Sequence, residues 1–362
     1  MAEAKTQPSQ EFEKVLKDSA TEVASFERHE KSLLERIQHA LHSSPALVPL
    51  IVLVLSVALF GLLLGSKFFS PFALTLILQQ VAIVGIVGSA QTLVVLTAGI
   101  DLSVGAIMIL CSVVMGRTAV VYGVPLLIAY PLGFLVGLAC GAVNGLIGYA
   151  NGFLIAKIKL PPFIVTLGMW QIVLATNFLY SRNETIRSQD IDAQAPLLKL
   201  FGWTVVGSLT LGIVVMVLLV LVLHYILTHT AWGRHVYAIG DDPDAADLSG
   251  VQVQKMLISV YTISGLICAL AGWVLIGRIG AVAPTSGQFA NIESITAVVI
   301  GGISLFGGRG SILGMLFGAL IVGVFALGLR LLGTDPQWTY LLIGVLIIAA
   351  VAIDQWIRKV AG

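Results

Sequence analysis

The chain has 362 residues, of which 57% are hydrophobic and only 11% are charged. Because soluble domains carry about 25% charged residues, most of the surface of this chain cannot face water. Its 20 basic and 19 acidic residues give a net charge of +1, which excludes binding to nucleic acid through a basic surface.

Residues 1–45 form a charged segment ahead of the first apolar run. Apolar residues recur in it at helical spacing from Phe12 to Leu41, which predicts a cytoplasmic amphipathic helix lying on the membrane. A partly ordered soluble tail explains the same composition equally well. A signal peptide places its apolar run within about 15–30 residues of the start, so this segment does not read as one.

Apolar runs long enough to cross a bilayer fill the region from residue 46 to residue 357. They predict an all-α polytopic membrane protein with about ten transmembrane helices, some of them broken by glycine. The expected spans are 46–65, 73–98, 104–122, 124–152, 162–180, 206–229, 256–277, 291–306, 310–332 and 337–357.

The distribution of Lys and Arg around the span ends sets the expected orientation. It places the amino terminus and the short tail 358–362 on the cytoplasmic side. The bias is weak, but both termini inside is the arrangement that it favours.

Two glycine-containing interruptions stand in corresponding positions of the two halves. Residues 94–102 (VVLTAGIDL) align with residues 297–305 (AVVIGGISL), and glycine follows each stretch. Paired broken helices are a good sequence pointer to a transport pathway, although chance similarity of two glycine-rich breaks is the alternative. Both breaks face the same side in the predicted topology, so no inverted repeat is predicted.

Polar residues within the apolar runs are candidates for the translocation pathway or for helix breaks. A charged side chain in the membrane is costly and needs a reason. Asp101 is expected to cap a new helix start, with contact to a substrate or gating partner, or a place in a simple cytoplasmic loop, as the alternatives. The same readings apply to Asn291 and Glu293. Amide side chains either bind sugar hydroxyls or, more often, join helices. The candidates are Gln91, Asp101, Ser103, Asn144, Asn291, Glu293 and Ser304.

Small residues also recur every four positions along two of the expected spans. Such stripes let helix backbones approach closely, and therefore predict a tight bundle. They are Gly133, Gly137, Gly141 and Gly145 in one span and Gly314 and Gly318 in another.

No catalytic motif is found in the sequence. Nucleotide-binding GxxxxGK[ST], HExxH, GxSxG and CxxC patterns are all missing. The histidines lie in the amino-terminal segment and around one span end, and the three cysteines lie in apolar runs without metal-ligand spacing. The chain is predicted to be no enzyme and to bind no cofactor or metal, so any ATP must be hydrolysed by another chain.

The segment 230–255 joins two spans on the cytoplasmic side and predicts a short helix with its own end signals. Asp242 is suited to the N-cap, Pro243 to the first helical position and Asp244 to the positive end of the helix dipole, and Gly250 ends the helix. A short rigid helix is suited to docking on a moving partner, while an ordinary structured loop is the alternative.

Three stretches carry a family resemblance. Residues 97–105, residues 231–253 and residues 294–314 (SITAVVIGGISLFGGRGSILG) resemble the permease subunits of bacterial monosaccharide ABC importers, as does the motif KLPPFIVTLGM at residues 159–169. Ribose, xylose and fructose systems belong to that group. The resemblance covers nearly all of the chain beyond its amino-terminal segment. It implies import of a monosaccharide, with fructose ahead of ribose or mannose.

The resemblance also implies partners and a location. Two permease copies would form the pore in the bacterial inner membrane, two ATPase copies holding ATP and Mg would dock beneath, and a periplasmic protein would deliver the sugar. A cytoplasmic coupling helix of the permease would sit in a cleft of the ATPase. In this chain that role falls on Arg234, Gly240, Asp242, Asp244, Ala245, Ala246, Leu248 and Gly250. The pair Asp247-Leu248 departs from the family, in which Ala or Arg before Leu is commoner, so the docking detail is open.

Two other functions explain the apolar pattern. A permease of the branched-chain amino acid type differs in its substrate, which a binding protein for leucine-like ligands would reveal. An ion-coupled secondary transporter would work alone on a proton or sodium gradient. The end signals of the inner helix and the shortage of carboxylates within the spans argue against the second function.

Overall fold

The computed structural model describes residues 46–123, 153–154, 156–158 and 160–361. The expected amphipathic helix in residues 1–45 and the expected span 124–152 lie outside the described residues, and so do Asn144 and the glycine stripe from Gly133 to Gly145. The described part is almost entirely helical. The all-α membrane fold predicted from the sequence is therefore confirmed.

Seven helical segments of the described chain are long and apolar enough to cross a membrane, and they fall where spans are expected. The helices concerned are α3 (Leu47–Leu64), α4 (Pro71–Leu96), α5 (Val104–Gly116), α7 (Pro162–Ser181), α9 (Leu211–His229), α12 (Val253–Ile279) and α14 (Ile312–Leu331). A 3₁₀ turn, η2 (Gly65–Lys67), extends α3, and a π-helical turn, η3 (Arg117–Val121), extends α5.

Shorter elements join these helices. They are α8 (Ser188–Gln194), the 3₁₀ helix η4 (Pro196–Gly202), the antiparallel strands β1 (Thr204–Val206) and β2 (Leu209–Thr210), α10 (Ala231–Asp241), α11 (Pro243–Leu248) and α13 (Ala290–Ile300). The last helix, α15 (Pro336–Ala361), continues through most of the expected tail 358–362.

Two of the expected spans need correction. The span 206–229 begins only at Leu211, because the residues before it form the β1–β2 hairpin. The span 291–306 is too long, because α13 has 11 residues and ends at Ile300. At 1.5 Å per residue such a helix covers about 16 Å, roughly half of the hydrocarbon core.

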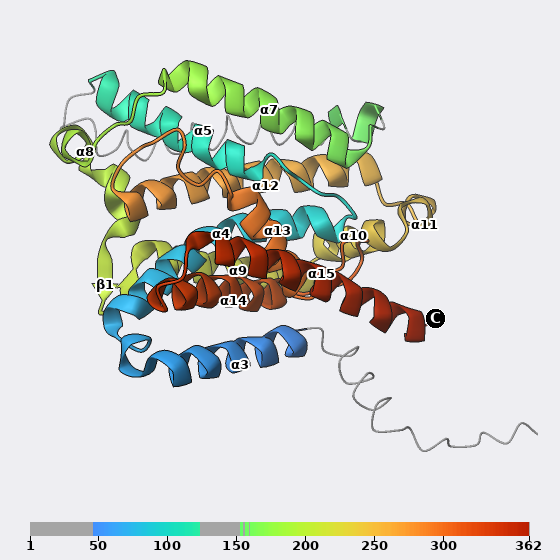
Figure 1. The fold of residues 1–362 in the computed structure, drawn as a ribbon. Coiled ribbons are helices and arrows are strands. Elements are labelled where there is room, and N and C mark those ends of the chain that lie inside the picture. The colour runs from blue at the N-terminus through green and yellow to red at the C-terminus, as the bar shows by residue number, and fades with distance from the viewer. Residues whose placement is uncertain (1–45, 124–152, 155, 159, 362) are drawn as a thin grey trace, which may run out of the picture. The chain divides into compact units, whose positions relative to one another are not determined.

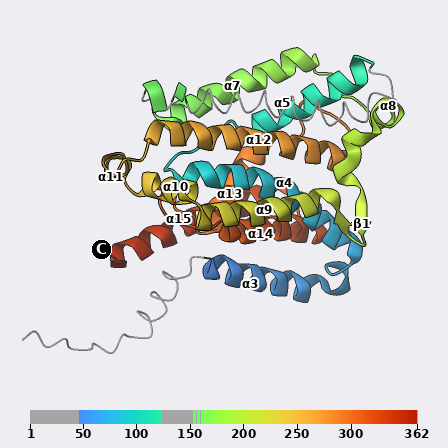
Figure 2. The same ribbon diagram turned by 180° about the vertical axis from the view of Figure 1, so that it is seen from behind.

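Helix α4 occupies the centre of this bundle. It packs against α9, α12, α13 and α14, and every residue from Val81 to Leu96 is buried. In both views α3 and α7 lie on opposite sides of it (Figures 1 and 2). A helix buried on all sides is apolar on all sides, so the polar residues that α4 does carry mark sites of specific hydrogen bonding.

The two ends of the bundle differ. One end, called here the α10 end, carries α10 and α11, and the other, the α8 end, carries α8 and the β1–β2 hairpin (Figures 1 and 2). At the α8 end the residues after α7 and α12 pair through a β-bridge. In that bridge the Ile186 N–H donates to the Val282 carbonyl at 2.9 Å, and the Val282 N–H donates back at 3.0 Å.

The glycine pair in α14 packs as the sequence predicts. A Cβ atom at Gly314 would overlap the carbonyl oxygen of Gly301, and one at Gly318 would overlap that of Ala297. Helix α14 therefore lies directly against the backbone of α13 and of the residue that follows it. Close backbone contact therefore helps to hold the short helix against α14.

We predict that Gly318→Ala destabilises the protein by about 1–3 kcal/mol, because the new methyl group must push α14 away from α13. Gly168→Ala is the matched control, since a Cβ at this position in α7 has nothing within 4 Å. Thermal unfolding of detergent-purified protein measures both. A Gly318→Ala variant as stable as the Gly168→Ala variant would contradict the close contact.

Candidate functional site

The first chain break, residues 97–103, separates α4 from α5 and is held by a side chain of α4 itself. Gln91 is fully buried. In the amide orientation that satisfies its hydrogen bonds, its Nε2 donates to the Asp101 carbonyl at 2.9 Å and its Oε1 accepts the Asp101 N–H at 3.2 Å. This amide replaces the helical hydrogen bonds that the backbone of Asp101 lacks.

The carboxylate of Asp101 is buried, with 1% of the residue exposed, and it acts on the chain beside it. Its Oδ1 accepts hydrogen bonds from the Ser103 N–H at 2.8 Å and the Ser103 hydroxyl at 2.6 Å. The sequence predicts that Asp101 binds backbone N–H groups at a new helix start. The N–H group that it binds is that of Ser103, the residue just before α5 begins at Val104.

Two further helices bind the same break. On α7 the Thr166 hydroxyl donates to the Ile100 carbonyl at 2.9 Å, and on α13 the Asn291 Nδ2 donates to the Leu102 carbonyl at 3.4 Å. On α12 the Tyr261 hydroxyl lies beside Gly99 and has no hydrogen-bond partner in the described structure. The break is thus the point at which α4, α7, α12 and α13 meet.

Thr166 and Tyr261 were not among the sequence candidates. The signal for Thr166 was a hydroxyl residue one turn after the pair Pro161-Pro162, and Tyr261 gave no signal beyond a polar tip in an apolar span. Neither position can be assigned to the break without knowing which helices surround it.

The remaining polar candidates divide between two places. Glu293 is half-buried and accepts a hydrogen bond from Gln80 Nε2 on α4 at 3.1 Å. Ser304 is buried in the second break, residues 301–311, where its hydroxyl accepts the Phe306 N–H at 3.1 Å. The structure therefore brings Gln91, Asp101, Ser103 and Asn291 together, while Glu293 and Ser304 lie in other contacts.

The second break lies directly against the first. The Gly308 N–H donates to the Leu96 carbonyl at 3.0 Å, and a Cβ at Gly307 would come within 2.8 Å of Ala98. The glycines that follow the second aligned stretch thus contact the first aligned stretch. Because both follow helices that end toward the α10 end, their likeness is not that of an inverted repeat (Figure 1).

The inner segment 230–255 contains two helices rather than one. Thr230 caps α10 by accepting the Gly233 N–H at 3.2 Å. Asp242 caps α11 by accepting the N–H groups of Asp244 and Ala245, both at 3.0 Å, with Pro243 in the first turn. Gly250 follows with φ of 87°. The predicted cap and stop of the short helix are confirmed.

The residues assigned to coupling differ in exposure. Leu248 is 90% exposed although it is apolar, whereas Ala246 is 5% exposed and Gly240 is buried. Gly240 and Ala246 thus face the bundle. The outward-facing members are Arg234, Asp242, Asp244, Ala245, Leu248 and Gly250.

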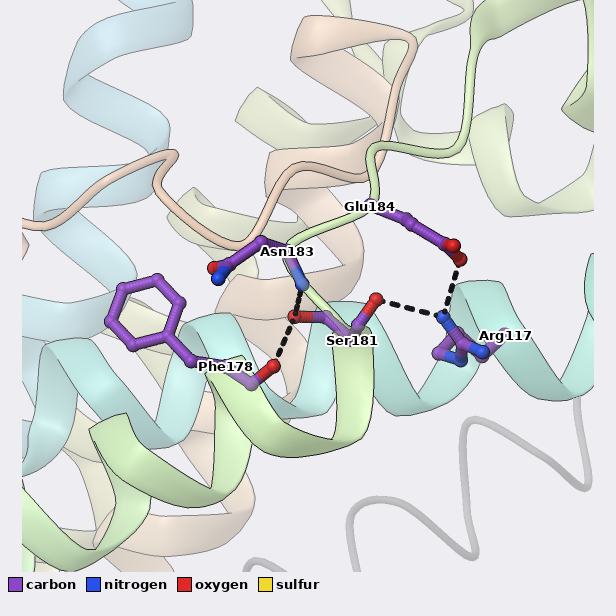
Figure 3. Close-up of polar contacts among 5 residues, drawn as sticks. All are labelled: Arg117, Phe178, Ser181, Asn183 and Glu184. Carbon is purple, nitrogen blue, oxygen red and sulfur yellow. Dashed lines mark hydrogen bonds and ion pairs between the residues drawn. The ribbon is translucent and has the colours of Figure 1, made fainter.

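A separate polar cluster joins α5 to α7 toward the α8 end (Figure 3). Arg117, whose side chain is only 10% exposed, donates through Nη1 to the Ser181 carbonyl at 2.9 Å and to Glu184 at 3.3 Å. Its guanidinium also lies 5.6 Å from the centre of the Tyr180 ring. A carbonyl at the end of α7 and one carboxylate stabilise this buried arginine, which favours a structural role in joining α5 to α7.

The contacts at both breaks position backbone, and none of them brings a nucleophile to a base. Among the described residues no group of three His, Cys, Asp or Glu side chains could hold a metal ion.

Comparison with known proteins decides the family. The family described as "Branched-chain amino acid transport system / permease component" matches residues 73–351. The chain belongs to this permease family. The permease is 72% identical over 98% of both chains to the fructose import permease protein FrcC of Rhizobium meliloti.

More distant relatives also cover most of the permease. It is 36% identical to the ribose import permease protein RbsC of Bacillus subtilis, over 84% of this chain and 90% of the relative. It is 33% identical to the D-allose transport system permease protein AlsC of Escherichia coli, over 85% and 91%. No solved structure matches it. The permease is thus a multi-pass membrane protein whose relatives carry out transport rather than catalysis.

We predict that Asp101→Ala destabilises the permease by about 1–3 kcal/mol, because it removes the carboxylate oxygen that accepts hydrogen bonds from the buried Ser103 N–H and hydroxyl. Asp101→Asn keeps an acceptor oxygen at the same position and is the matched control, with a smaller loss. Thermal unfolding in detergent compares them. Equal losses in the two variants would show that the charge of Asp101, and not its hydrogen bonds, is what the break requires.

Proposed function

We propose that this permease is the membrane-spanning subunit of an ATP-binding cassette importer that carries fructose across the bacterial inner membrane. The assignment of fructose as the substrate rests on one observation, the 72% identity over nearly the whole chain to a fructose import permease. Relatives at 36% and 33% identity are named for ribose and allose, which extends the support to monosaccharides as a class.

A branched-chain amino acid permease is the second candidate, because the matching family is described by that substrate. The relatives named as sugar permeases match over 84% of this chain or more. The more specific likeness therefore supports a sugar. An ion-coupled secondary transporter would need no partner ATPase, and the relatives named as import permeases give it no support.

The partners follow from the proposed system. Two copies of the permease form the pore, two ATPase subunits bind ATP and Mg beneath it, and a periplasmic protein delivers the sugar. The permease itself binds no cofactor and hydrolyses nothing. With both termini in the cytoplasm, the α10 end faces the ATPase and the α8 end faces the periplasm.

The exposed face of α10 and α11 is the part that meets the ATPase. Leu248 projects an apolar side chain into water, and Arg234 and Asp244 add exposed charge of both signs. An apolar side chain exposed in this way favours a partner that covers it. Ala246, assigned to this role from the sequence, is buried, so its part is to seat α11 on the bundle.

We predict that proteoliposomes holding the permease and its ATPase hydrolyse ATP faster when a fructose-loaded binding protein is added. Empty protein and protein loaded with leucine serve as controls. Uptake of labelled fructose should require ATP on the side of the vesicle membrane to which the ATPase is bound. Gradient-driven uptake by the permease alone would overturn the proposal, and stimulation by the leucine-loaded protein alone would favour the amino acid alternative.

We predict that Leu248→Ala weakens co-purification of the ATPase by about tenfold, as expected for loss of an apolar anchor at an interface. Stability should not change, because the side chain makes little contact with the bundle. Val206→Ala is the matched control, since Val206 is an exposed apolar residue, at 69%, at the α8 end. Unchanged ATPase binding in the Leu248 variant would remove this residue from the docking surface.

A further inference from the structure

Helix α10 is fastened to the bundle at its first turn. The Trp232 Nε1 donates to the Ser259 hydroxyl on α12 at 2.9 Å. A Cβ at Gly233 would overlap the backbone of Leu227 on α9. The beginning of α10 is therefore fixed to the two long helices that precede and follow the inner segment.

The second half of α10 is fastened to a different part of the chain, the second break. The Tyr237 hydroxyl donates to the Gly310 carbonyl at 3.0 Å. At Gly240, a Cβ would overlap both the Leu96 carbonyl oxygen and the Gly308 nitrogen. Backbone meets backbone here, so no side-chain rotation can take up a displacement.

The second break forms hydrogen bonds both to the end of α4, where the first break begins, and within itself. The Gly308 N–H donates to the Leu96 carbonyl at 3.0 Å, and the Ser304 N–H donates to the Arg309 carbonyl at 3.0 Å. Gly307 and Gly308 adopt φ of 81° and 69°, a conformation that glycine tolerates far better than other residues. The end of α10, the end of α4 and the second break thus form one packed junction.

We propose that Tyr237 and Gly240 are positioning residues that transmit a displacement of α10 to both chain breaks at once. The inference rests on the proposed function and deepens it, because it names the contacts through which ATPase movement reaches the membrane. Closely packed elements pass a displacement on, since packed interiors deform little. A shift of the end of α10 therefore moves Gly308 and Leu96 together.

The competing route runs through α11, which follows α10 and precedes α12. On that route α11 would push on α12 directly, and the contacts of Tyr237 and Gly240 would only support the fold. The two routes differ in one measurable way. Only the junction route makes the yield of transport depend on the Tyr237 hydroxyl.

The test compares Tyr237→Phe and Gly240→Ala with the unchanged permease in proteoliposomes that contain the ATPase and fructose-loaded binding protein. Tyr225→Phe is the matched control, because Tyr225 is exposed on the neighbouring α9. Four quantities are measured: ATPase co-purification, basal hydrolysis, stimulated hydrolysis, and fructose imported per ATP. The first two report folding and docking, and the last two report transmission.

We expect Tyr237→Phe to keep ATPase binding and basal hydrolysis while fructose imported per ATP falls about fivefold, the scale of one hydrogen bond. Gly240→Ala should lower the yield further, and the control should match the unchanged permease. A normal yield in Tyr237→Phe would overturn the proposal, even if Gly240→Ala failed to fold. Loss of ATPase binding in Tyr237→Phe would also overturn it, by placing the residue in docking. Absence of ATP-driven uptake by the unchanged permease would instead refute the proposed function.

Discussion

A chain that leaves its helical path inside a membrane bundle must satisfy the freed N–H and C=O groups with its own atoms, because hydrocarbon offers no partner for them. The permease does so at residues 97–103 with polar atoms from three helices. Gln91 hydrogen-bonds to the backbone of Asp101, Thr166 to the Ile100 carbonyl and Asn291 to the Leu102 carbonyl. Each polar residue sits in an otherwise apolar helix, and its position is explained by the break that it faces.

The same constraint explains why the two breaks lie together. The Leu96 carbonyl, left free where α4 ends, accepts the Gly308 N–H from the second break. One hydrogen bond thus satisfies a group from each. Such mutual satisfaction requires close approach of two backbones, and glycine at positions 240, 307 and 308 leaves the space for it. The short α13 follows from this arrangement, since its chain must turn away at Gly301 to reach the junction.

Local and long-range features were predictable to different degrees. Hydropathy located the spans, and the cap of α11 was readable because Asp242, Pro243 and Asp244 are neighbours in sequence. Only one of the two hydrogen-bonding partners of Asp101 could be predicted from the sequence. Ser103 lies two residues away, whereas the pairing of Gln91 with the backbone of Asp101 depends on how the chain folds back after Leu96. The length of α13 was misjudged because its apolar pattern continues through glycines that end the helix.

The inner helix pair separates two kinds of requirement. Toward the bundle, α10 presents the Tyr237 hydroxyl to the Gly310 carbonyl and the backbone of Gly240 to Leu96 and Gly308, so these contacts require a hydroxyl at one position and a small residue at the other. Toward water, α10 and α11 present Arg234, Asp244 and Leu248, whose exposed side chains take no part in the contacts of the junction. A permease built in this way can change the partner that it fits while keeping the same link to its breaks. In the proposed importer, recognition of the ATPase and transmission of its movement are therefore assigned to opposite faces of one short segment.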